Sequence, residues 1–393
     1  MRLPLSASGA GAGAPYGGPV DDAARGSREL VDWDLAARTA VRLARPGPAV
    51  SAAEAVHAVA LLHESAAAAG PHVAAVTGLG VARGPGALVI ERGAWARANV
   101  ASFRTLLAPV LDDALARRTE QRRPGRRPSS GPPRGLGVAG RVTGAELGSL
   151  LAVLSSRVLG QYDALGEGPE AGRLLLVAPN VVAVQRELSV DLADFSLWVA
   201  LHEETHRVQF AAAPWLAEHL RERARALSGG LLGEPGAVAD RLAAGARALP
   251  GLVRSLSGGA GGDGPAPSLV DLVADADQRR ALAEVTAVMS LLEGHADVAM
   301  DAVGPSVVPS VKLIRRRFAA RRRTSRGLVD SALRQLLGLD AKMRQYADGA
   351  RFVRGVTQRV GTDGLNAVWS GPAALPAPEE VADPAAWVRR VHG

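Results

Sequence analysis

The sequence predicts a mainly α-helical protein with a small β element. Most of the chain places apolar residues three and four positions apart, which is the spacing of one helix face. Residues 173–188 differ, because they combine leucine-rich and β-branched runs in the manner of strands. With 393 residues, of which 47% are hydrophobic, the chain is long enough for one large domain or two ordinary ones.

Changes in composition along the chain predict its organisation. Residues 1–28 are rich in Gly, Ala and Pro and lack the apolar core of a signal peptide, so we expect a disordered leader. Three amphipathic stretches predict an N-terminal helical region over residues 29–118. An Arg/Pro/Gly-rich linker is expected at 119–140, since it offers nothing to bury. The main domain is then expected at 141–372, followed by a proline-punctuated tail with one short helix at 373–393.

Within the main domain, the strand-like stretch and the helix after it define the expected architecture. Two apolar runs flank Pro179 and Asn180, a turn signal, so a hairpin or pair of strands is predicted over residues 174–187. A long helix follows, for which either Asp191 or Asp194 is a suitable N-cap. Further helices are expected over residues 147–159, 271–300 and 309–337.

Composition also excludes some classes of protein. The chain has no cysteine, so any transition metal must be held by histidines and carboxylates. No run of about 18 apolar residues occurs, which predicts no membrane segment and a cytoplasmic protein. Lys312 and Lys342 are the only lysines; this arginine bias is typical of GC-rich genomes, and the net charge of +7 is modest. The basic composition alone therefore does not indicate a nucleic-acid partner.

The segment LHEETHRVQF carries the candidate chemistry. His202 and His206 lie four residues apart, so on a helix they share a face and can bind one ion. Glu203 lies about 100° around the helix, where it can reach a water molecule without being a ligand. Apolar neighbours such as Trp198 and Phe210 predict a buried helix, in which unpartnered polar groups cost several kcal/mol. The pattern therefore predicts a zinc site with Glu203 as catalytic base.

A catalytic zinc site usually has a third protein ligand, and LLEGHADVAMD offers the candidates. Glu293 follows an apolar helical stretch and is favoured. His295 is an alternative ligand or a donor to the substrate oxyanion, because it cannot share a helix face with Glu293. Asp297 lies on the face of Glu293 and is expected to accept a hydrogen bond from the outer nitrogen of His202 or His206.

These motifs resemble known metallopeptidases. HExxH followed by ExxxD resembles the Glu-zincin branch of the zincins, which implies zinc ligation by His202, His206 and Glu293 and an outer carboxylate at Asp297. The separation of the second histidine and the distal glutamate is longer than in the best-known members. Segments such as WVALHEETHRVQF and SLLEGHADVAMDAVGP resemble a largely actinobacterial family of zinc-dependent metallopeptidases, one branch of which is associated with deazaflavin-coenzyme biosynthesis. This resemblance implies a zincin-like fold.

The prediction is therefore a zinc-dependent hydrolase acting on a peptide or amide, with the 174–187 hairpin offering an edge strand to an extended substrate. Two alternatives belong to other classes. One is a non-catalytic protein with structural zinc. The other is binding of nucleic acid or another anionic partner through an arginine cluster, although a solvated helix paired with acidic neighbours is favoured. The cluster comprises Arg315, Arg316, Arg317, Arg321, Arg322, Arg323 and Arg326. The sequence does not indicate an oligomeric state.

Overall fold

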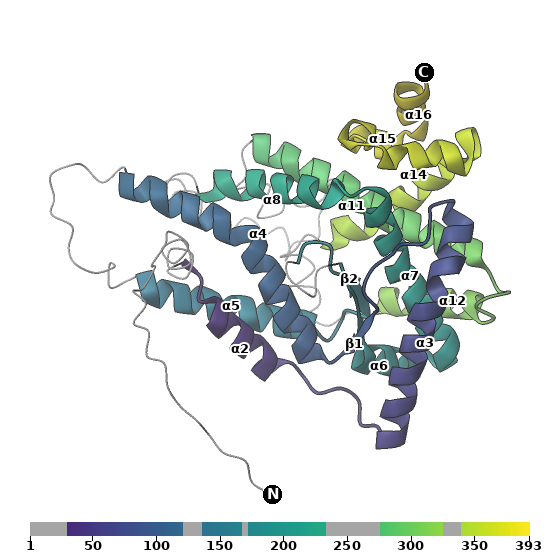
Figure 1. Cartoon of the computed structure of the whole chain (residues 1–393), viewed down its shortest axis with the longest axis horizontal. Coiled ribbons are helices and arrows are strands. Elements are labelled where there is room, and N and C mark those ends of the chain that lie inside the picture. Colours follow the sequence, from purple (N-terminus) through teal and green to yellow (C-terminus); the bar gives the residue numbers. More distant parts are fainter. Residues whose placement is uncertain (1–29, 121–135, 167–171, 233–275, 325–338) are drawn as a thin grey trace, which may run out of the picture.

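The computed structural model describes residues 30–120, 136–166, 172–232, 276–324 and 339–393, which fold mainly as helices around a small sheet (Figure 1). The first helices are α2 (Trp33–Leu43), α3 (Ala52–Thr77), α4 (Arg92–Glu120), α5 (Leu136–Leu154) and α6 (Ala178–Leu188). The later helices are α7 (Leu192–Ala212), α8 (Leu216–Leu232), α11 (Ala276–Val303), α12 (Val311–Thr324), α14 (Leu339–Asn366), α15 (Pro378–Ala382) and α16 (Pro384–His392). The predicted mainly α-helical fold with a small β element is confirmed.

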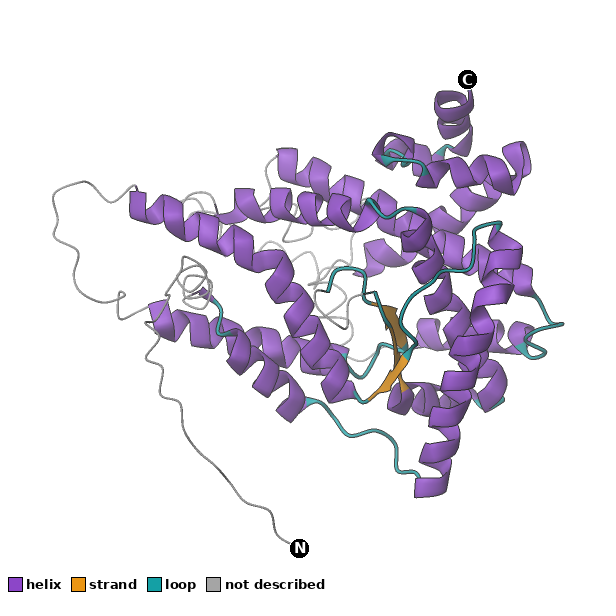
Figure 2. Cartoon of the chain, in the orientation of Figure 1, coloured by secondary structure: helices purple, strands orange, loops and turns teal. Residues whose placement is uncertain are grey.

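The sheet has three short strands in the order β1-β3-β2 and lies among the helices (Figure 2). Its strands are β1 (Leu88–Ile90), β2 (Gly160–Tyr162) and β3 (Leu174–Val177). β3 pairs in parallel with β1 and antiparallel with β2. All four residues of β3 are buried, which explains its continuous apolar sequence. β2 has a strand partner on one side only, so within the described chain it forms an edge of the sheet.

The predicted hairpin over residues 174–187 is wrong. Only its first run forms a strand, and helix α6 begins directly after it with Pro179 in the first turn. Proline suits that position, because its missing N–H group would have no helical partner there and its fixed φ matches the helix. Val181, Val184 and Leu188 are buried at helical spacing. The second apolar run therefore packs as a helix face, and β3 is a central strand rather than an edge.

Helix α7 is buried on nearly all sides, as its sequence predicts. Asp191 caps it by accepting a hydrogen bond from the backbone of Asp194, whose own carboxylate accepts from Ser310 N at the start of α12. Helix α3 packs along α7, and β1 supplies an outer strand of the sheet. Parts of the N-terminal helical region at 29–118 thus lie directly against the helix that carries HExxH.

Helix α11 crosses α14 at very short range because glycines face each other. A Cβ atom on Gly294 would collide with the backbone of Gly349, and one on Gly349 would collide with the carbonyl oxygen of Ser290. Since real Cβ atoms do not fit there, glycine is required on both helices. This close crossing fixes the position of α11 against α14 at the residue that follows Glu293.

The C-terminal residues form two helices that pack against α14, so the expected tail with one helix is corrected. Trp387 of α16 is fully buried, and its ring contacts Phe352 of α14 at a centroid distance of 5.8 Å. Arg390 donates to both carboxylate oxygens of Glu380 at 2.7 Å. Burial of these aromatic side chains makes the C-terminal segment part of the core.

Three members of the arginine cluster make contacts within the chain. Arg315 donates to the backbone oxygen of Asp297 at 2.8 Å, and Arg317 donates to that of Leu188 at 2.6 Å. Arg321 pairs with Glu187 at 2.8 Å. The leader at 1–28, most of the linker at 119–140 and Arg326 lie outside the described residues. Across the described ranges, no helix has the length and apolar character needed to cross a bilayer.

The Glu380–Arg390 pair predicts an acid-dependent stability. Hydrogen bonds from Arg390 and from the Ala377 N–H hold the pKa of Glu380 below its usual value of 4.5. The folded state thus gains stability above the unfolded pKa, and this gain is lost as the pH falls through the lower folded pKa. Glu380→Gln is expected to lower the free energy of unfolding more at pH 7 than at pH 3, as measured by urea denaturation. Glu379→Gln, at an exposed neighbour, is the control; an equal effect of Glu380→Gln at both pH values would contradict the prediction.

Candidate metal centre

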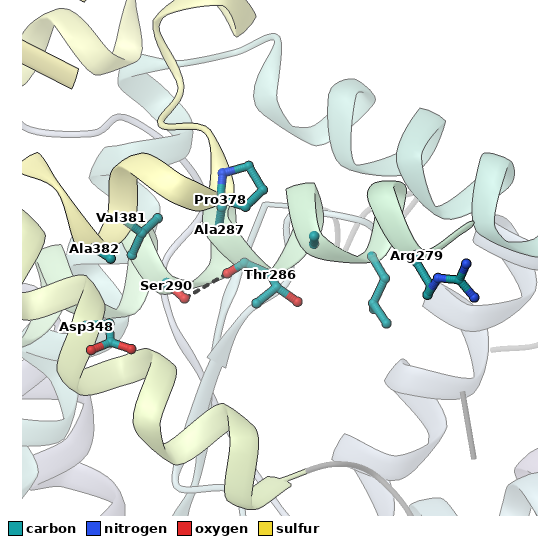
Figure 3. A pocket seen from close by; sticks show the side chains of 10 residues that line it. Arg279, Thr286, Ala287, Ser290, Asp348, Pro378, Val381 and Ala382 are labelled. Atoms are coloured by element: carbon teal, nitrogen blue, oxygen red, sulfur yellow. Dashed lines mark hydrogen bonds between the residues drawn. The ribbon is translucent and has the colours of Figure 1, made fainter. Parts of the chain in front are cut away.

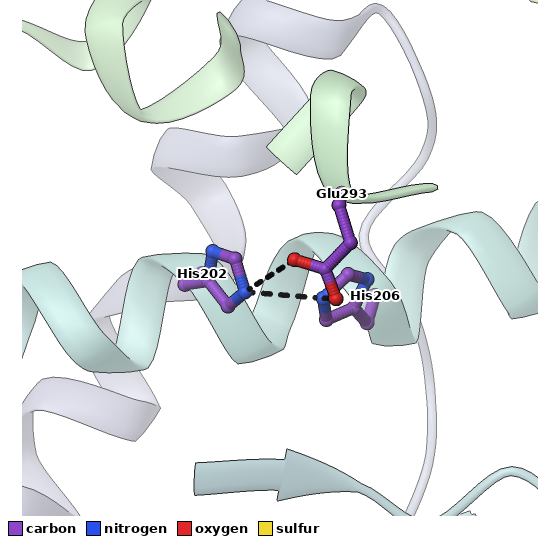
Figure 4. A group of neighbouring side chains, drawn as sticks. All are labelled: His202, His206 and Glu293. Carbon is purple, nitrogen blue, oxygen red and sulfur yellow. Dashed lines mark hydrogen bonds and ion pairs between the residues drawn. The ribbon is translucent and has the colours of Figure 1, made fainter. Parts of the chain in front are cut away.

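Helix α7 brings the two motif histidines together. His202 and His206 lie one turn apart, and their Nε2 atoms are 3.2 Å from each other. Glu293 reaches them from α11, although it lies far along the chain (Figure 4). Its carboxylate oxygens lie 3.5 Å from His202 Nε2 and 3.7 Å from His206 Nε2. The structure therefore gathers these three predicted ligands at one point.

The spacing of these donors fits one metal ion of the size of zinc. Ligands at 2.0–2.1 Å from Zn²⁺ in tetrahedral geometry lie roughly 3.3 Å from one another. The two Nε2 atoms are 3.2 Å apart, Oε2 of Glu293 lies 3.5 Å from that of His202, and Oε1 lies 3.7 Å from that of His206. One ligand atom from each of the three residues can be chosen so that all lie within 4.8 Å of one another. Two imidazoles and a carboxylate are also a donor set typical of catalytic zinc. The geometry of His202, His206 and Glu293 thus suits Zn²⁺.

The carboxylates around His202 favour a positive charge at this point. Burial lowers the pKa of His202, but the hydrogen bond and charge of Glu293, with the charges of Glu203 and Asp297, outweigh it and raise the pKa to about 9. Burial and the charge of His202 lower the pKa of His206. A divalent cation between the imidazoles satisfies the same electrostatic demand as a proton.

Glu203 projects from α7 toward strand β2 and is almost fully buried. A Cβ atom on Gly160 would lie 2.6 Å from its Cγ and 2.9 Å from its Oε1, so only glycine permits this close approach. Its carboxylate accepts a hydrogen bond from the Tyr162 backbone, which lowers the pKa. Burial is the largest influence; with the charge of Glu293 it outweighs the opposing charge of His202 and raises the pKa of Glu203 to about 7.

Gln209 is a site residue that sequence reasoning missed. It is fully buried, and its Oε1 lies 2.9 Å from His206 Nδ1. Its Nε2 donates to the Leu292 backbone oxygen at 2.9 Å and contacts His295 Nδ1 at 3.0 Å. An amide oxygen accepts, so His206 donates from Nδ1 and keeps its Nε2 lone pair for a metal. Its position three residues after His206 places it on the same helix face, and this spacing was the available signal.

His295 and Asp297 do not take the positions expected of them. His295 is buried 3.0 Å from Gln209 and against Trp369, outside the ligand group, and burial lowers its pKa to about 4. The outer nitrogen of His202 contacts Met300 Sδ at 3.4 Å rather than Asp297. Asp297 lies 3.6 Å from Arg315 and acts on His202 through its charge alone. His295 lies two residues from Glu293 and so on another face of α11, whereas Asp297 shares the face of Glu293 but is paired with Arg315.

A cleft of about 360 Å³ opens onto the donor group. His202, Glu203, His206 and Glu293 line one part of it, and helices α4, α8 and α11 with strand β2 form its walls. The volume lies at the lower end of the range of small-molecule sites. A substrate in this cleft can reach both the metal ligands and Glu203.

A second hollow of about 360 Å³ lies between α11, α14 and α15 (Figure 3). Thr286, Ser290, Asp348 and Val381 are among the residues that line it. None of the donor-group residues faces it, and Ser290 donates its hydroxyl hydrogen to the Thr286 backbone oxygen at 2.8 Å. This hollow therefore lies apart from the metal group.

Two histidines on one helix, a distant glutamate and a buried glutamate between the histidines define the zincin class of metallohydrolase sites. The model of the zincin-like metallopeptidase family matches residues 31–388, so the chain belongs to this family. A solved structure from Chloroflexus aurantiacus, described as "a putative hydrolase with a novel fold", is similar, with a TM-score of 0.61 and 27% identity. The match covers 92% of this chain and 99% of that one. No curated protein matches the sequence.

These findings support a hydrolase, and the family implies zinc as the metal. The family match also crosses the predicted boundaries at residues 119–140 and 373–393, in accord with the packing of the N- and C-terminal helices against the site-bearing elements.

The bridging position of Gln209 makes a prediction for metal affinity. Gln209→Leu removes the acceptor for His206 Nδ1 and the donor to the Leu292 carbonyl while keeping a similar volume. Loss of such outer contacts typically weakens metal binding 10- to 100-fold. We expect that loss in zinc affinity, measured by competition with a chromophoric chelator. Gln185→Leu, which removes a side-chain hydrogen bond to Val190 remote from the site, should leave zinc affinity unchanged; equal affinities for both variants would contradict the assignment.

Proposed function

We propose that the protein is a zinc-dependent hydrolase that cleaves an amide bond, specifically a peptide bond, with Glu203 as general base. One observation carries the proposal: the His202–His206–Glu293 donor group and the buried Glu203 carboxylate line the same cleft. Hydrolysis needs both parts, a metal position and a proton acceptor that is not a ligand.

A zinc ion in such a site supplies Lewis acidity, which makes water acidic near pH 7 and polarises a carbonyl group. Glu203 accepts the proton of the attacking water and then transfers it to the leaving amine. Its raised pKa of about 7 suits both steps, because a base and its conjugate acid are then both accessible near neutral pH. His202, His206 and Glu293 hold the metal, and Gln209 orients the His206 ring.

Strand β2 is the candidate surface for the substrate backbone. Gly160, Gln161 and Tyr162 line the cleft, and β2 is paired only with β3 in the described structure. An extended peptide can add to such an edge through backbone hydrogen bonds. The proposed edge strand for the substrate is therefore β2, next to Glu203, and not the segment 174–187.

The open cleft favours an enzyme over a structural zinc protein. Structural zinc sites are closed by four protein ligands, whereas the described residues bring three donors together at this cleft. The intrachain contacts of Arg315, Arg317 and Arg321 give no specific support to an anionic partner. A cytoplasmic location, an actinobacterial origin and a link to deazaflavin biosynthesis remain predictions from the sequence.

The role of Glu203 is tested by Glu203→Gln, which keeps the shape but removes the base. We expect zinc content to stay at one ion per chain and kcat for a cleaved peptide to fall by about 10²–10⁴-fold, the usual contribution of general acid–base catalysis. Metal analysis and a quenched-fluorescence peptide library, applied to both proteins, provide the measurement. Unchanged turnover in the variant would exclude Glu203 as the base.

Gly160→Ala tests whether β2 positions this base. The new Cβ collides with Glu203, so the carboxylate must move while the donor group is untouched. A displacement of about 1 Å can reduce the rate by about 10²-fold. We expect a fall of that order in kcat with unchanged zinc affinity. Gly371→Ala, at a glycine with open space around it, is the control; wild-type kcat in Gly160→Ala would contradict this role.

A further inference from the structure

We propose that the cleft selects substrates with a bulky, uncharged apolar side chain beside the scissile bond. This inference rests on the proposed hydrolase function and adds the class of substrate. The side chains that would contact the substrate's apolar group are Phe103 and Leu106 of α4, Leu220 of α8 and Met289 of α11.

The α4 wall of the cleft is one helix face with a polar and an apolar half. Asn99, Ser102, Phe103 and Leu106 recur at helical spacing and all line the cleft. The polar half is already engaged: Asn99 donates to Gln161 Oε1 at 3.1 Å, and Ser102 donates to an Asp163 carboxylate oxygen at 3.1 Å. The polar half therefore holds β2 in place, and the apolar half is left to contact a ligand.

The apolar surface is continuous with the metal group. Phe210 follows His206 by one turn of α7, and Met289 precedes Glu293 by one turn of α11. Phe103 and Met289 are 37% and 39% exposed, which places large apolar side chains in contact with solvent in the cleft. A ligand that covers them removes apolar surface from water, which is favourable.

The charges that line the cleft argue against an acidic substrate side chain. Among the described residues that line the cleft there is no arginine or lysine, while Glu203, Glu293 and Asp163 are acidic. An acidic side chain would be desolvated without a cationic partner and repelled by these groups. Asp163 is poorly placed to form an ion pair with a basic substrate side chain, because it is 5% exposed and already accepts hydrogen bonds from Ser102 and the Gly166 N–H. An apolar side chain avoids both costs.

Hydroxamate ligands provide a test that does not depend on turnover. Binding of acetohydroxamate measures the contribution of the metal group alone. Two amino-acid hydroxamates, one with an isobutyl and one with a carboxymethyl side chain, measure what the ligand's side chain adds. Binding to the zinc-loaded full chain is measured by calorimetry. We expect the isobutyl ligand to bind at least about 10-fold more tightly than the carboxymethyl ligand, the lower limit of hydrophobic-pocket discrimination.

Met289→Lys is the specificity variant, because it places a cation at a partly exposed position in the cleft. Relative to acetohydroxamate in the same variant, we expect weaker binding of the isobutyl ligand and tighter binding of the carboxymethyl ligand than in the wild type. Leu282→Lys is the matched control: it lies on the same helix but lines the second hollow, and it should keep the wild-type preference. No acetohydroxamate binding by the wild type would overturn the hydrolase proposal together with this one. Normal acetohydroxamate binding with equal affinity for the other two ligands, or an unchanged preference in Met289→Lys, would overturn this inference alone.

Discussion

The site depends on the buried contact between helices α7 and α11. The Gln209 amide joins them: it lies beside His206 Nδ1 on its own helix and donates to the carbonyl of Leu292, the residue before Glu293. A fully buried amide must satisfy its polar atoms, so this contact restricts how the two helices can slide or rotate. The Gly294–Gly349 crossing holds α11 from its other side. Together they place a carboxylate from one helix against two imidazoles of another.

The two glutamates of the cleft have different environments and can therefore have different roles. Glu293 faces the histidine nitrogens, where a carboxylate can share a cation with them. Glu203 is covered by β2, and its burial raises its pKa toward neutrality. Different environments for two carboxylates allow one site to hold both a metal ligand and a proton acceptor.

The N-terminal helices contribute to the site as well as to the core. Helix α3 packs along α7, α4 forms a wall of the cleft, and β1 completes the sheet on the far side of β3. Because these elements surround the donor group, the family match over residues 31–388 corresponds to one packed structure. The walls of the cleft thus come from α4, α8 and α11 with β2, whereas the candidate metal donors come from α7 and α11.

Short-range patterns were sufficient to predict the helical fold and the geometry of HExxH, because helical periodicity and the four-residue spacing of His202 and His206 are local properties. Local pattern failed at residues 178–188, where Pro179 fits a helix start as well as a turn. Contacts between distant segments could not be read from the chain. The partner of His206 is Gln209 rather than Asp297, the edge strand is β2, and Gly160 is needed because Glu203 lies against it. The sequence by itself determined the helical fold and the spacing that puts His202 and His206 on one helix face. Only the tertiary structure decided which distant residues meet them, since burial and hydrogen-bond satisfaction depend on how the helices pack.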